Sequence, residues 1–361
     1  MKSELAEELL GSLMGWDREA FAEQVRRLEA MASHKWDEYG NFRPGVKFFE
    51  SLAAWLNQFP DDADRATALN FVLDRMVFLS DAEMTHLIEL VYPDHMETVL
   101  LRRVASSTGI SPFRVSDLAK HPDFVSLRRR SLVLGASDGA RLDRLRRSAP
   151  FLSHEQFLQS SEPPTDLIKP MTDKLSKALK DQGIDAPATF GHIFLVDDFA
   201  GSGKTLLRIE DDERKGKLHK LNDAINQLRK DGFVAEDVDV TVILYVASEQ
   251  AYDHVVKTLA STSLPSWEIR RVQSLPSTVR VDQSDTAMAD LSERFYDDSL
   301  NDEHKGRAPL GYADCALPLV LSHNTPNNSI SLLWADTTVE PQSLDRLALF
   351  PRYERHHRDR P

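Results

Sequence analysis

The sequence predicts an α/β protein with a mostly parallel sheet flanked by helices, preceded by an all-helical N-terminal domain. Apolar residues recur at helical spacing over about the first 95 residues, whereas short apolar strand candidates alternate with amphipathic helices after about residue 96. The length of 361 residues also exceeds the usual size of one domain. We therefore predict a helical interaction or regulatory domain over residues 1–95 and an α/β domain over residues 96–361.

Helical periodicity is clearest in the segments AFAEQVRRLEAMA, VKFFESLAAWLNQF and ATALNFVLDRMVFL. Asp61 and Asp62 after Pro60 mark one helix start, and Ser80 with Glu83 forms a capping-box pattern that marks another. Helical spacing in an acidic surround predicts that the aromatic residues of this region form a core rather than a base-stacking platform. These residues are Trp36, Tyr39, Phe42, Phe48, Phe49, Trp55 and Phe59.

The α/β pattern runs through the strand candidates SLVLGA, HIFLVDD and VDVTVILYVAS, with a helix expected at about residues 165–182. Such strands are expected to be mostly parallel, with ligands bound outside their carboxyl ends. The charged segment EDDERKGK at residues 210–217 is expected to be a solvated loop.

Charge is unevenly distributed along the chain, whose net charge is -13. Residues 1–100 carry 9 Lys or Arg against 19 Asp or Glu, whereas residues 101–150 carry 11 against 4. The acidic part would repel a phosphate backbone, so direct nucleic-acid binding by the N-terminal domain is disfavoured. A single cysteine, Cys315, excludes an internal disulfide, and there is no membrane-length apolar run, so we expect a soluble, cytoplasmic protein.

One motif combines paired acids with a glycine-rich loop at residues 193–205, IFLVDDFAGSGKT. Four apolar residues place Asp197 and Asp198 at the carboxyl edge of a buried strand, where they can accept hydrogen bonds from ribose hydroxyls or hold Mg²⁺, directly or through water. A loop and a helix starting near Thr205 would then bind a phosphate, with a terminal monophosphate preferred. The loop residues are Ala200, Gly201, Ser202, Gly203, Lys204 and Thr205.

Two other interpretations of this motif are weaker. The triphosphate P-loop spacing GxxxxGK[ST] requires glycine at position 198, which is Asp198 here. An ordinary strand-to-helix turn would leave the two acids and the full loop without a role. As it stands, DDFAGSGKT resembles the ribose-phosphate signature of phosphoribosyltransferases. The resemblance assigns the ribose hydroxyls to Asp197 and Asp198, and the 5′-phosphate to residues 200–205.

A second anion loop is expected about 60 residues upstream, where SLVLGA runs into SDGARLDRLRR. Phosphoribosyltransferases hold pyrophosphate in a loop after an earlier strand, so the resemblance assigns that role to Ser137, Asp138, Gly139 and Arg141. Arg144, Arg146 and Arg147 follow on a predicted helix, where arginines either contact a phosphate or are solvated and paired with residues such as Asp143.

A polar cluster near residue 325 offers candidates for contact with a base. Asn324, Asn327 and Asn328 can read a base edge, although they equally favour a turn around Pro326. Taken in order, SDGAR, VDDFAGSGKT, HNTPNNSISLLW and LFPRYERH resemble the phosphoribosyltransferase-like proteins of bacterial conflict and anti-phage systems, over about residues 96–356. This resemblance implies a type I-like phosphoribosyltransferase fold and a role beside defence-system proteins, including a retron reverse transcriptase and its DNA.

The predicted mechanism is displacement at the anomeric carbon of phosphoribosyl pyrophosphate or a nucleotide, with Mg²⁺ as cofactor. The enzyme would be a glycosyl transferase or a nucleotide-cleaving enzyme in which Asp197 and Asp198 fix the ribose and stabilise developing charge. The alternative is a nucleotide sensor of the same fold that regulates a partner without chemistry, since no base-binding hood is identifiable in the sequence.

Overall fold

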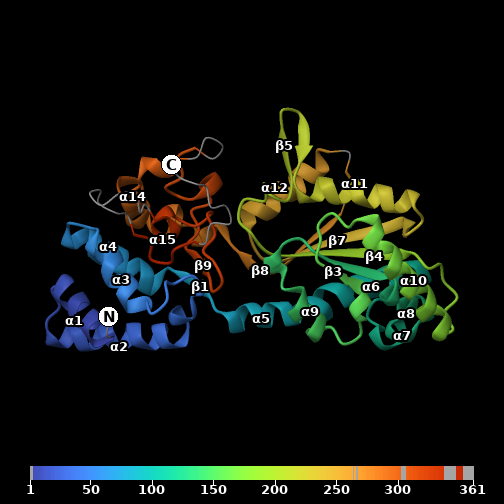
Figure 1. Ribbon diagram of the computed structural model, residues 1–361, viewed down its shortest axis with the longest axis horizontal. Coiled ribbons are helices and arrows are strands. Elements are labelled where there is room, and N and C mark those ends of the chain that lie inside the picture. The colour runs from blue at the N-terminus through green and yellow to red at the C-terminus, as the bar shows by residue number, and fades with distance from the viewer. Residues whose placement is uncertain (1–2, 263, 266, 302–305, 337–346, 353–361) are drawn as a thin grey trace. The chain divides into compact units, whose positions relative to one another are not determined.

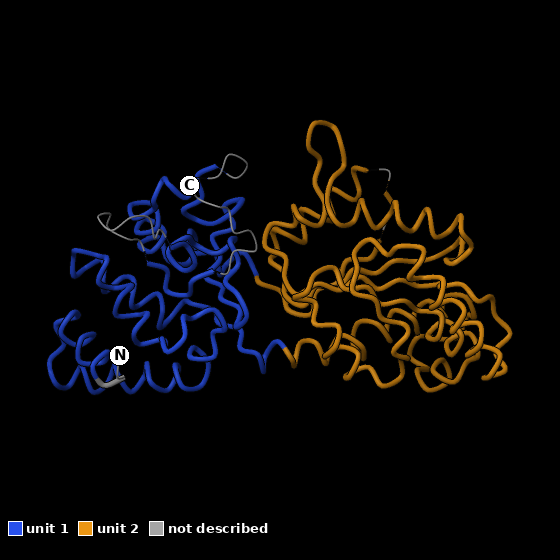
Figure 2. Tube along the Cα trace, in the orientation of Figure 1, with its two compact units in different colours: residues 1–84, 276–361 blue, residues 85–275 orange. Residues whose placement is uncertain are grey.

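The computed structural model describes residues 3–262, 264–265, 267–301, 306–336 and 347–352. Two compact units are distinguished in Figure 2: unit 1 comprises Met1–Met84 and Pro276–Pro361, and unit 2 comprises Thr85–Leu275. Helix α5 (Asp81–Leu90) begins in unit 1 and ends in unit 2. No described helix is both long enough and apolar enough to cross a lipid bilayer.

Unit 1 is mainly helical and draws on both ends of the sequence. Its strands β1 (Val77–Leu79) and β9 (Leu319–Leu321) pair in parallel, with Val77 opposite Leu319. Its α-helices are α1 (Ser3–Leu13), α2 (Arg18–His34), α3 (Phe48–Asn57), α4 (Asp62–Asp74), α13 (Val281–Ser284), α14 (Thr286–Arg294) and α15 (Ser331–Trp334). The 3-10 helices are η1 (Trp36–Glu38), η5 (Ser277–Val279), η6 (Asp298–Leu300) and η7 (Tyr312–Asp314).

The division of the chain differs from the boundary that we placed between residues 95 and 96. Buried contacts join the N-terminal helices to the C-terminal segment: the indole of Trp55 donates to the carbonyl of Leu332 at 2.8 Å, and the hydroxyl of Tyr39 lies 3.0 Å from that of Thr325. Phe350 is fully buried in the same core. The helices therefore share one apolar core with residues far away in the sequence.

The N-terminal aromatic residues do form a core, as predicted. Phe48, Trp55 and Phe59 are fully buried, and Phe42 packs against the same cluster. The capping box is also present, because Ser80 Oγ accepts from the amide of Glu83 at 3.1 Å and Glu83 Oε2 accepts from the amide of Ser80 at 2.9 Å. Strand β1 separates α4 from α5, so these helices are not joined as a helix-turn-helix.

Unit 2 is built around a five-stranded sheet of order β3-β2-β4-β7-β8, in which every neighbouring pair is parallel. The strands are β2 (Ser131–Gly135), β3 (Phe157–Leu158), β4 (Phe190–Ala200), β7 (Val234–Ser248) and β8 (Glu268–Leu275). One face packs on α10 (Thr165–Asp181), α11 (Lys217–Lys230) and α12 (Glu249–Ala260), and Figure 1 shows α11 and α12 lying along the sheet. The α/β fold with a parallel sheet is confirmed.

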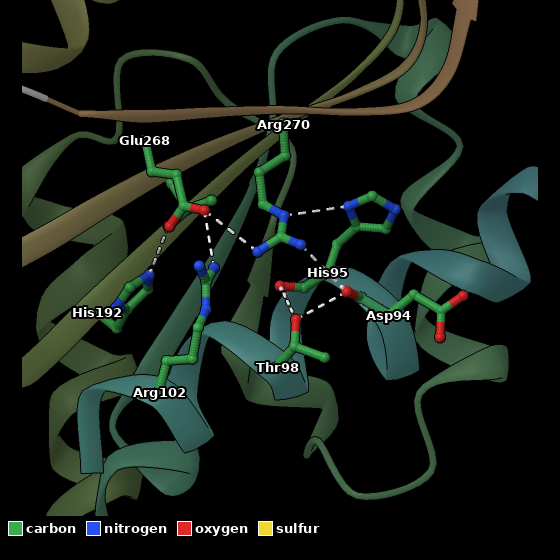
Figure 3. A network of polar contacts seen from close by, with 8 residues as sticks. Asp94, His95, Thr98, Arg102, His192, Glu268 and Arg270 are labelled. Atoms are coloured by element: carbon green, nitrogen blue, oxygen red, sulfur yellow. Dashed lines mark hydrogen bonds and ion pairs between the residues drawn. The ribbon is translucent and has the colours of Figure 1, made fainter. Parts of the chain in front are cut away.

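The remaining helices of unit 2 precede the central strand β4 in the sequence. They are the π-helix η2 (Val91–Glu97), α6 (Thr98–Thr108), α7 (Val115–Lys120), α8 (Pro122–Arg129), η3 (Asp138–Ala140), α9 (Leu142–Ser148) and η4 (His154–Gln156). Figure 3 shows how η2 and α6 are tied to β8: Arg270 reaches His95 at 3.2 Å, and Glu268 pairs with Arg270 at 3.2 Å and with Arg102 at 2.8 Å. This network fixes the π-helix beside an edge strand of the sheet.

The segment after β4 corrects two expectations. No helix starts near Thr205; instead β5 (Arg208–Glu210) and β6 (Glu213–Lys215) form an antiparallel hairpin, and α11 begins at Lys217. Residues 210–217 are thus not a loop. Asp211 and Asp212 adopt positive φ angles of 53° and 61°, which suit the two central positions of a tight hairpin turn.

Buried His192 on β4 gives unit 2 a predicted pH dependence. Its Nε2 lies 3.1 Å from Thr241 Oγ1, and burial lowers its pKa to about 3. Below an unfolded-state pKa of about 6.5 the unfolded chain binds the proton and the native state does not, so stability should fall by about 1.4 kcal/mol per pH unit as the pH drops from about 6.5 towards 3.

Hydrogen exchange of β4 peptides, corrected for the intrinsic rate at each pH, measures this loss. His192→Gln is the control, because it keeps a hydrogen-bonding group near Thr241 and does not titrate. Its stability should decline less steeply with acidification than that of the wild type. Equal slopes for the two proteins would contradict the assignment to His192.

Candidate functional site

The predicted acid pair lies near the carboxyl end of β4, in the centre of the sheet. Asp197 is 4% exposed, and each of its carboxylate oxygens faces a protein donor. Ser137 Oγ donates to Oδ1 at 2.5 Å, and Lys217 Nζ donates to Oδ2 at 2.6 Å. The strand register, with Asp197 opposite Leu244 of β7, therefore holds the carboxylate between the loop after β2 and the start of α11.

The ionisation of Asp197 is balanced between opposing effects. Burial raises the pKa of this carboxyl, the ammonium of Lys217 lowers it, and the neighbouring charge of Asp198 raises it; the net shift is upward. Lys217 is thus the main group that favours the charged form of Asp197. Its removal would leave the carboxylate without its countercharge.

The loop after β2, which contains the candidate residues 137–141, lies against the acid pair. Ser137 Oγ also lies 3.4 Å from Asp198 Oδ1, and a Cβ added at Gly139 would overlap Asp198 Oδ2. A side chain at position 139 would therefore displace the Asp198 carboxylate from its present place. Asp138 lies in the 3-10 turn η3 and is exposed, and Arg141 follows with a φ of 45°.

Two further residues donate side-chain hydrogen bonds to backbone carbonyls of this loop. The buried hydroxyl of Tyr245, on β7, donates to the carbonyl of Ala140 at 2.6 Å, and Gln159 Nε2 donates to the carbonyl of Ser137 at 2.5 Å. Burial raises the pKa of Tyr245 well above its ordinary value, so its hydroxyl keeps the proton that it donates. Tyr245 and Gln159 are accordingly positioning residues for the loop.

The glycine-rich loop runs from the last residue of β4, Ala200, to Thr205. Gly201 is anchored through its carbonyl, which accepts from Ser248 Oγ at 2.5 Å, and Gly203 has a φ of +73°. Within the described chain, the amides of Ser202, Gly203 and Thr205 have no hydrogen-bond acceptor. Lys204 and Thr205 are exposed. A glycine turn with available amides has the properties of an anion-binding loop.

The arginines after the 137–141 loop lie on α9, as predicted. Arg144 Nη1 donates to Thr85 Oγ1 at 2.8 Å, and Arg147 lies 3.7 Å from Asp143 in an exposed pair. Arg146 is partly buried. Arg144 and Arg147 thus have protein partners. Contact with a ligand stays a prediction for all three arginines.

The base-side candidates belong to unit 1, whereas the acids and both loops belong to unit 2. The amide of Asn328 is used internally, donating to the carbonyl of Tyr312 at 3.1 Å. Asn324 accepts from Asn41 at 3.3 Å, and the carbonyl of Asn327 accepts from the amide of Tyr312 at 2.7 Å. The turn around Pro326 is present. A role of these asparagines in base recognition stays a prediction. The last four residues of the motif LFPRYERH lie outside the described residues.

Lys217, Tyr245 and Gln159 were not among the residues singled out from the sequence. Lys217 is the last residue of the charged segment 210–217, a position that resembles solvated surface. Tyr245 lies inside an apolar strand, and Gln159 follows a two-residue strand. Their roles depend on contacts with residues 20 or more positions away, which local sequence patterns do not reveal.

The donor set limits how a metal ion could bind. Among the described residues, no group of three or more His, Cys, Asp or Glu side chains is placed to hold a metal. Both oxygens of Asp197 already face Lys217 and Ser137, so direct ligation by Asp197 does not fit. Mg²⁺ commonly binds through one or two carboxylates, waters and ligand phosphates, and Asp198 is compatible with that arrangement.

Comparison with protein-family models matches residues 52–352 to the family described as PRTase-CE. No match was found among curated proteins or among solved structures. The matched range includes the acid pair, both loops and the polar cluster around Pro326.

Proposed function

Because the chain belongs to the PRTase-CE family, a phosphoribosyltransferase-like family, we propose that it binds a ribose 5-phosphate moiety and acts at its anomeric carbon. The donor would be phosphoribosyl pyrophosphate or a nucleotide. One observation carries the proposal: a buried acid at the carboxyl end of the central parallel strand lies between a glycine-rich loop and a second loop in hydrogen-bond contact with it. Ligands of parallel α/β sheets bind at this edge.

Each part of the site has a role in this proposal. Asp198 and Asp197 accept hydrogen bonds from the ribose hydroxyls, and residues 200–205 bind the 5′-phosphate through backbone amides. Residues 137–141 bind the leaving pyrophosphate or face the leaving base. Lys217 maintains the negative charge of Asp197, which stabilises positive charge that develops on the ribose in the transition state.

Mg²⁺ is proposed to accompany the ligand. Asp198, directly or through water, and the phosphate oxygens of the ligand would hold the ion. When bound, it would neutralise charge on the leaving pyrophosphate.

A nucleotide sensor is the second candidate, and the contacts of Asp197 favour it. Both carboxylate oxygens are already engaged by protein donors at 2.5 and 2.6 Å, an arrangement that suits a stable binding site. In this case the ligand would be retained intact and would change the assembly of a partner protein. The biological context that we propose for either function is anti-phage defence beside other defence proteins, with a retron reverse transcriptase complex as one such partner; its support is the order of sequence motifs.

Asp198→Asn tests the proposed chemistry. The purified full chain is incubated with Mg²⁺, phosphoribosyl pyrophosphate and a panel of nucleotides, and both the ligand-induced thermal shift and the products are followed. Loss of a charged hydrogen-bond acceptor should lower turnover by about 10- to 100-fold, since such bonds contribute about 1.5–3 kcal/mol.

Asp173→Asn is the matched control, because Asp173 is exposed on α10 of the same unit. It should behave like the wild type. Full turnover in Asp198→Asn would rule out the proposed role of the acid pair. Stabilisation of the wild type by a nucleotide without any product would support the sensor instead.

A further inference from the structure

A pocket of ≈ 380 Å³ lies in unit 2 beside the glycine-rich loop. It is lined by the end of that loop, the base of the β5–β6 hairpin, the first turn of α11 and residues 161–162. Pockets of about 300–1,000 Å³ are the usual size for small-molecule ligands. Of the lining residues, only Thr205 and Lys217 have a role in the proposed function.

The lining of the pocket is strongly cationic. Five Lys or Arg side chains and a single acidic side chain line it: Arg208, Arg214, Lys215, Lys217, Lys220 and Glu162. Glu210 of the hairpin pairs with Arg208 at 3.3 Å and with Lys215 at 3.2 Å, and both pairs are partly exposed. Glu210 and Glu162 offset part of the positive charge, but cations outnumber acids in the lining, so the pocket favours a negatively charged ligand.

The first turn of α11 adds to this preference. Helix N-termini carry partial positive charge and are normally stabilised by acidic residues. Here the first turn contains no acidic residue, but Lys217, His219 and Lys220 line the pocket. Cations at this end of a helix repel the dipole, and an anion in the pocket would relieve that repulsion.

Two residues make the pocket continuous with the proposed ribose-phosphate site. Thr205 is the last residue of the glycine-rich loop and lines the pocket. Lys217 also lines the pocket, while its Nζ contacts Asp197 at 2.6 Å. The amide of Lys217 donates to the carbonyl of Thr205 at 3.1 Å, which joins the loop to the helix start.

We propose that this pocket binds the terminal phosphates of a nucleoside 5′-di- or triphosphate whose first phosphate lies on the glycine-rich loop. The inference rests on the proposed function and narrows its ligand from any ribose 5-phosphate to one with further phosphates at the 5′ end. Arg214, Lys215 and Lys220 then contact phosphates beyond the first. The exposed ion pairs of Lys220 with Glu162 at 2.8 Å and of Lys215 with Glu210 at 3.2 Å give way because such surface pairs are weak.

Calorimetric titration of the full chain with AMP, ATP and inorganic tripolyphosphate tests this inference, with Arg214→Gln/Lys220→Gln as the pocket variant. Wild type should bind ATP at least about 10-fold more tightly than AMP, because charged hydrogen bonds to phosphate are strong. The variant should lose this preference while its affinity for AMP is unchanged. The advantage of ATP should also shrink as salt is added.

Arg229→Gln/Lys230→Gln is the matched control, since it removes the same two charges at the opposite end of α11. It should keep the preference for ATP. Equal affinity of the wild type for AMP and ATP, or an unchanged preference in the pocket variant, would overturn the inference and leave the proposed function intact. If tripolyphosphate binds through the pocket but AMP does not bind and Asp198→Asn changes nothing, the proposed function fails and an independent anion site remains.

Discussion

Replacing Lys217 with methionine is expected to lower the free energy of unfolding of unit 2 by about 3–5 kcal/mol at neutral pH, because it leaves a buried carboxylate without its countercharge. The ammonium lies 2.6 Å from Asp197, whose side chain is 5% exposed. Methionine keeps much of the apolar volume of the lysine stem, so the loss measures charge more than packing. Hydrogen-exchange protection of β4 and β7 peptides reports the change within unit 2.

A second substitution at Asp197 distinguishes loss of charge from loss of packing at Lys217. Lys217→Met/Asp197→Asn should recover most of the lost stability, because the neutral amide oxygen can still accept from Ser137 and no buried charge remains. In Lys217→Met alone, the pKa of Asp197 should rise further than it already does in the wild type. A raised native pKa stabilises at low pH and loses that effect as the pH rises, so the deficit should shrink on acidification.

Two outcomes would contradict this account of the ion pair. A stability of Lys217→Met within about 0.5 kcal/mol of the wild type, as for an exposed pair, would show that Asp197 does not depend on the ammonium. A double variant no more stable than Lys217→Met would place the loss in packing around residue 217. In either case, the charge of Asp197 would need another explanation before a catalytic role is assigned to it.

The sheet was largely predictable from the sequence because local patterns determine it. The apolar run Ile193–Val196 lies within β4, and the helix expected at about 165–182 is α10 (Thr165–Asp181). Ser137 and Asp197, 60 residues apart, come into contact at the carboxyl edge of the parallel sheet, where ligands of such sheets bind. The motifs identified both loops as candidates, but their mutual contact was not predicted, and their roles in binding remain predictions.

The features that were not predicted depend on distant partners. Val77 pairs with Leu319, so the C-terminal segment joins the N-terminal helices through contacts that periodicity cannot indicate. The β5–β6 hairpin depends on backbone conformations at Asp211 and Asp212 within a segment whose composition resembles a solvated loop. Lys217 becomes part of the site only because this hairpin returns the chain to Asp197. Charge alone does not distinguish such a lysine from a surface residue.

Gly203→Ala, in the glycine-rich loop, is expected to lower both the stability of unit 2 and its affinity for AMP. Gly203 has a φ of +73°, and an added Cβ would lie 2.7 Å from the carbonyl oxygen of Ala251 and 2.9 Å from Val255. The left-handed conformation costs alanine about 1–2 kcal/mol, and forcing a group into a packed site costs about 1–3 kcal/mol more. We expect a total loss of about 3 kcal/mol and weaker binding of AMP, because the loop must shift away from α12.

Gly232→Ala provides a matched control within the same unit, since its φ is +76° and an added Cβ would have nothing within 4 Å. That variant carries the conformational cost without the collision, so it should lose only about 1 kcal/mol and keep its affinity for AMP. The difference between the two variants, measured by hydrogen exchange and by titration, isolates the close approach of the loop to α12. Equal losses in both would mean that α12 yields at no cost, and that the loop is not held rigidly enough to be preorganised for a phosphate.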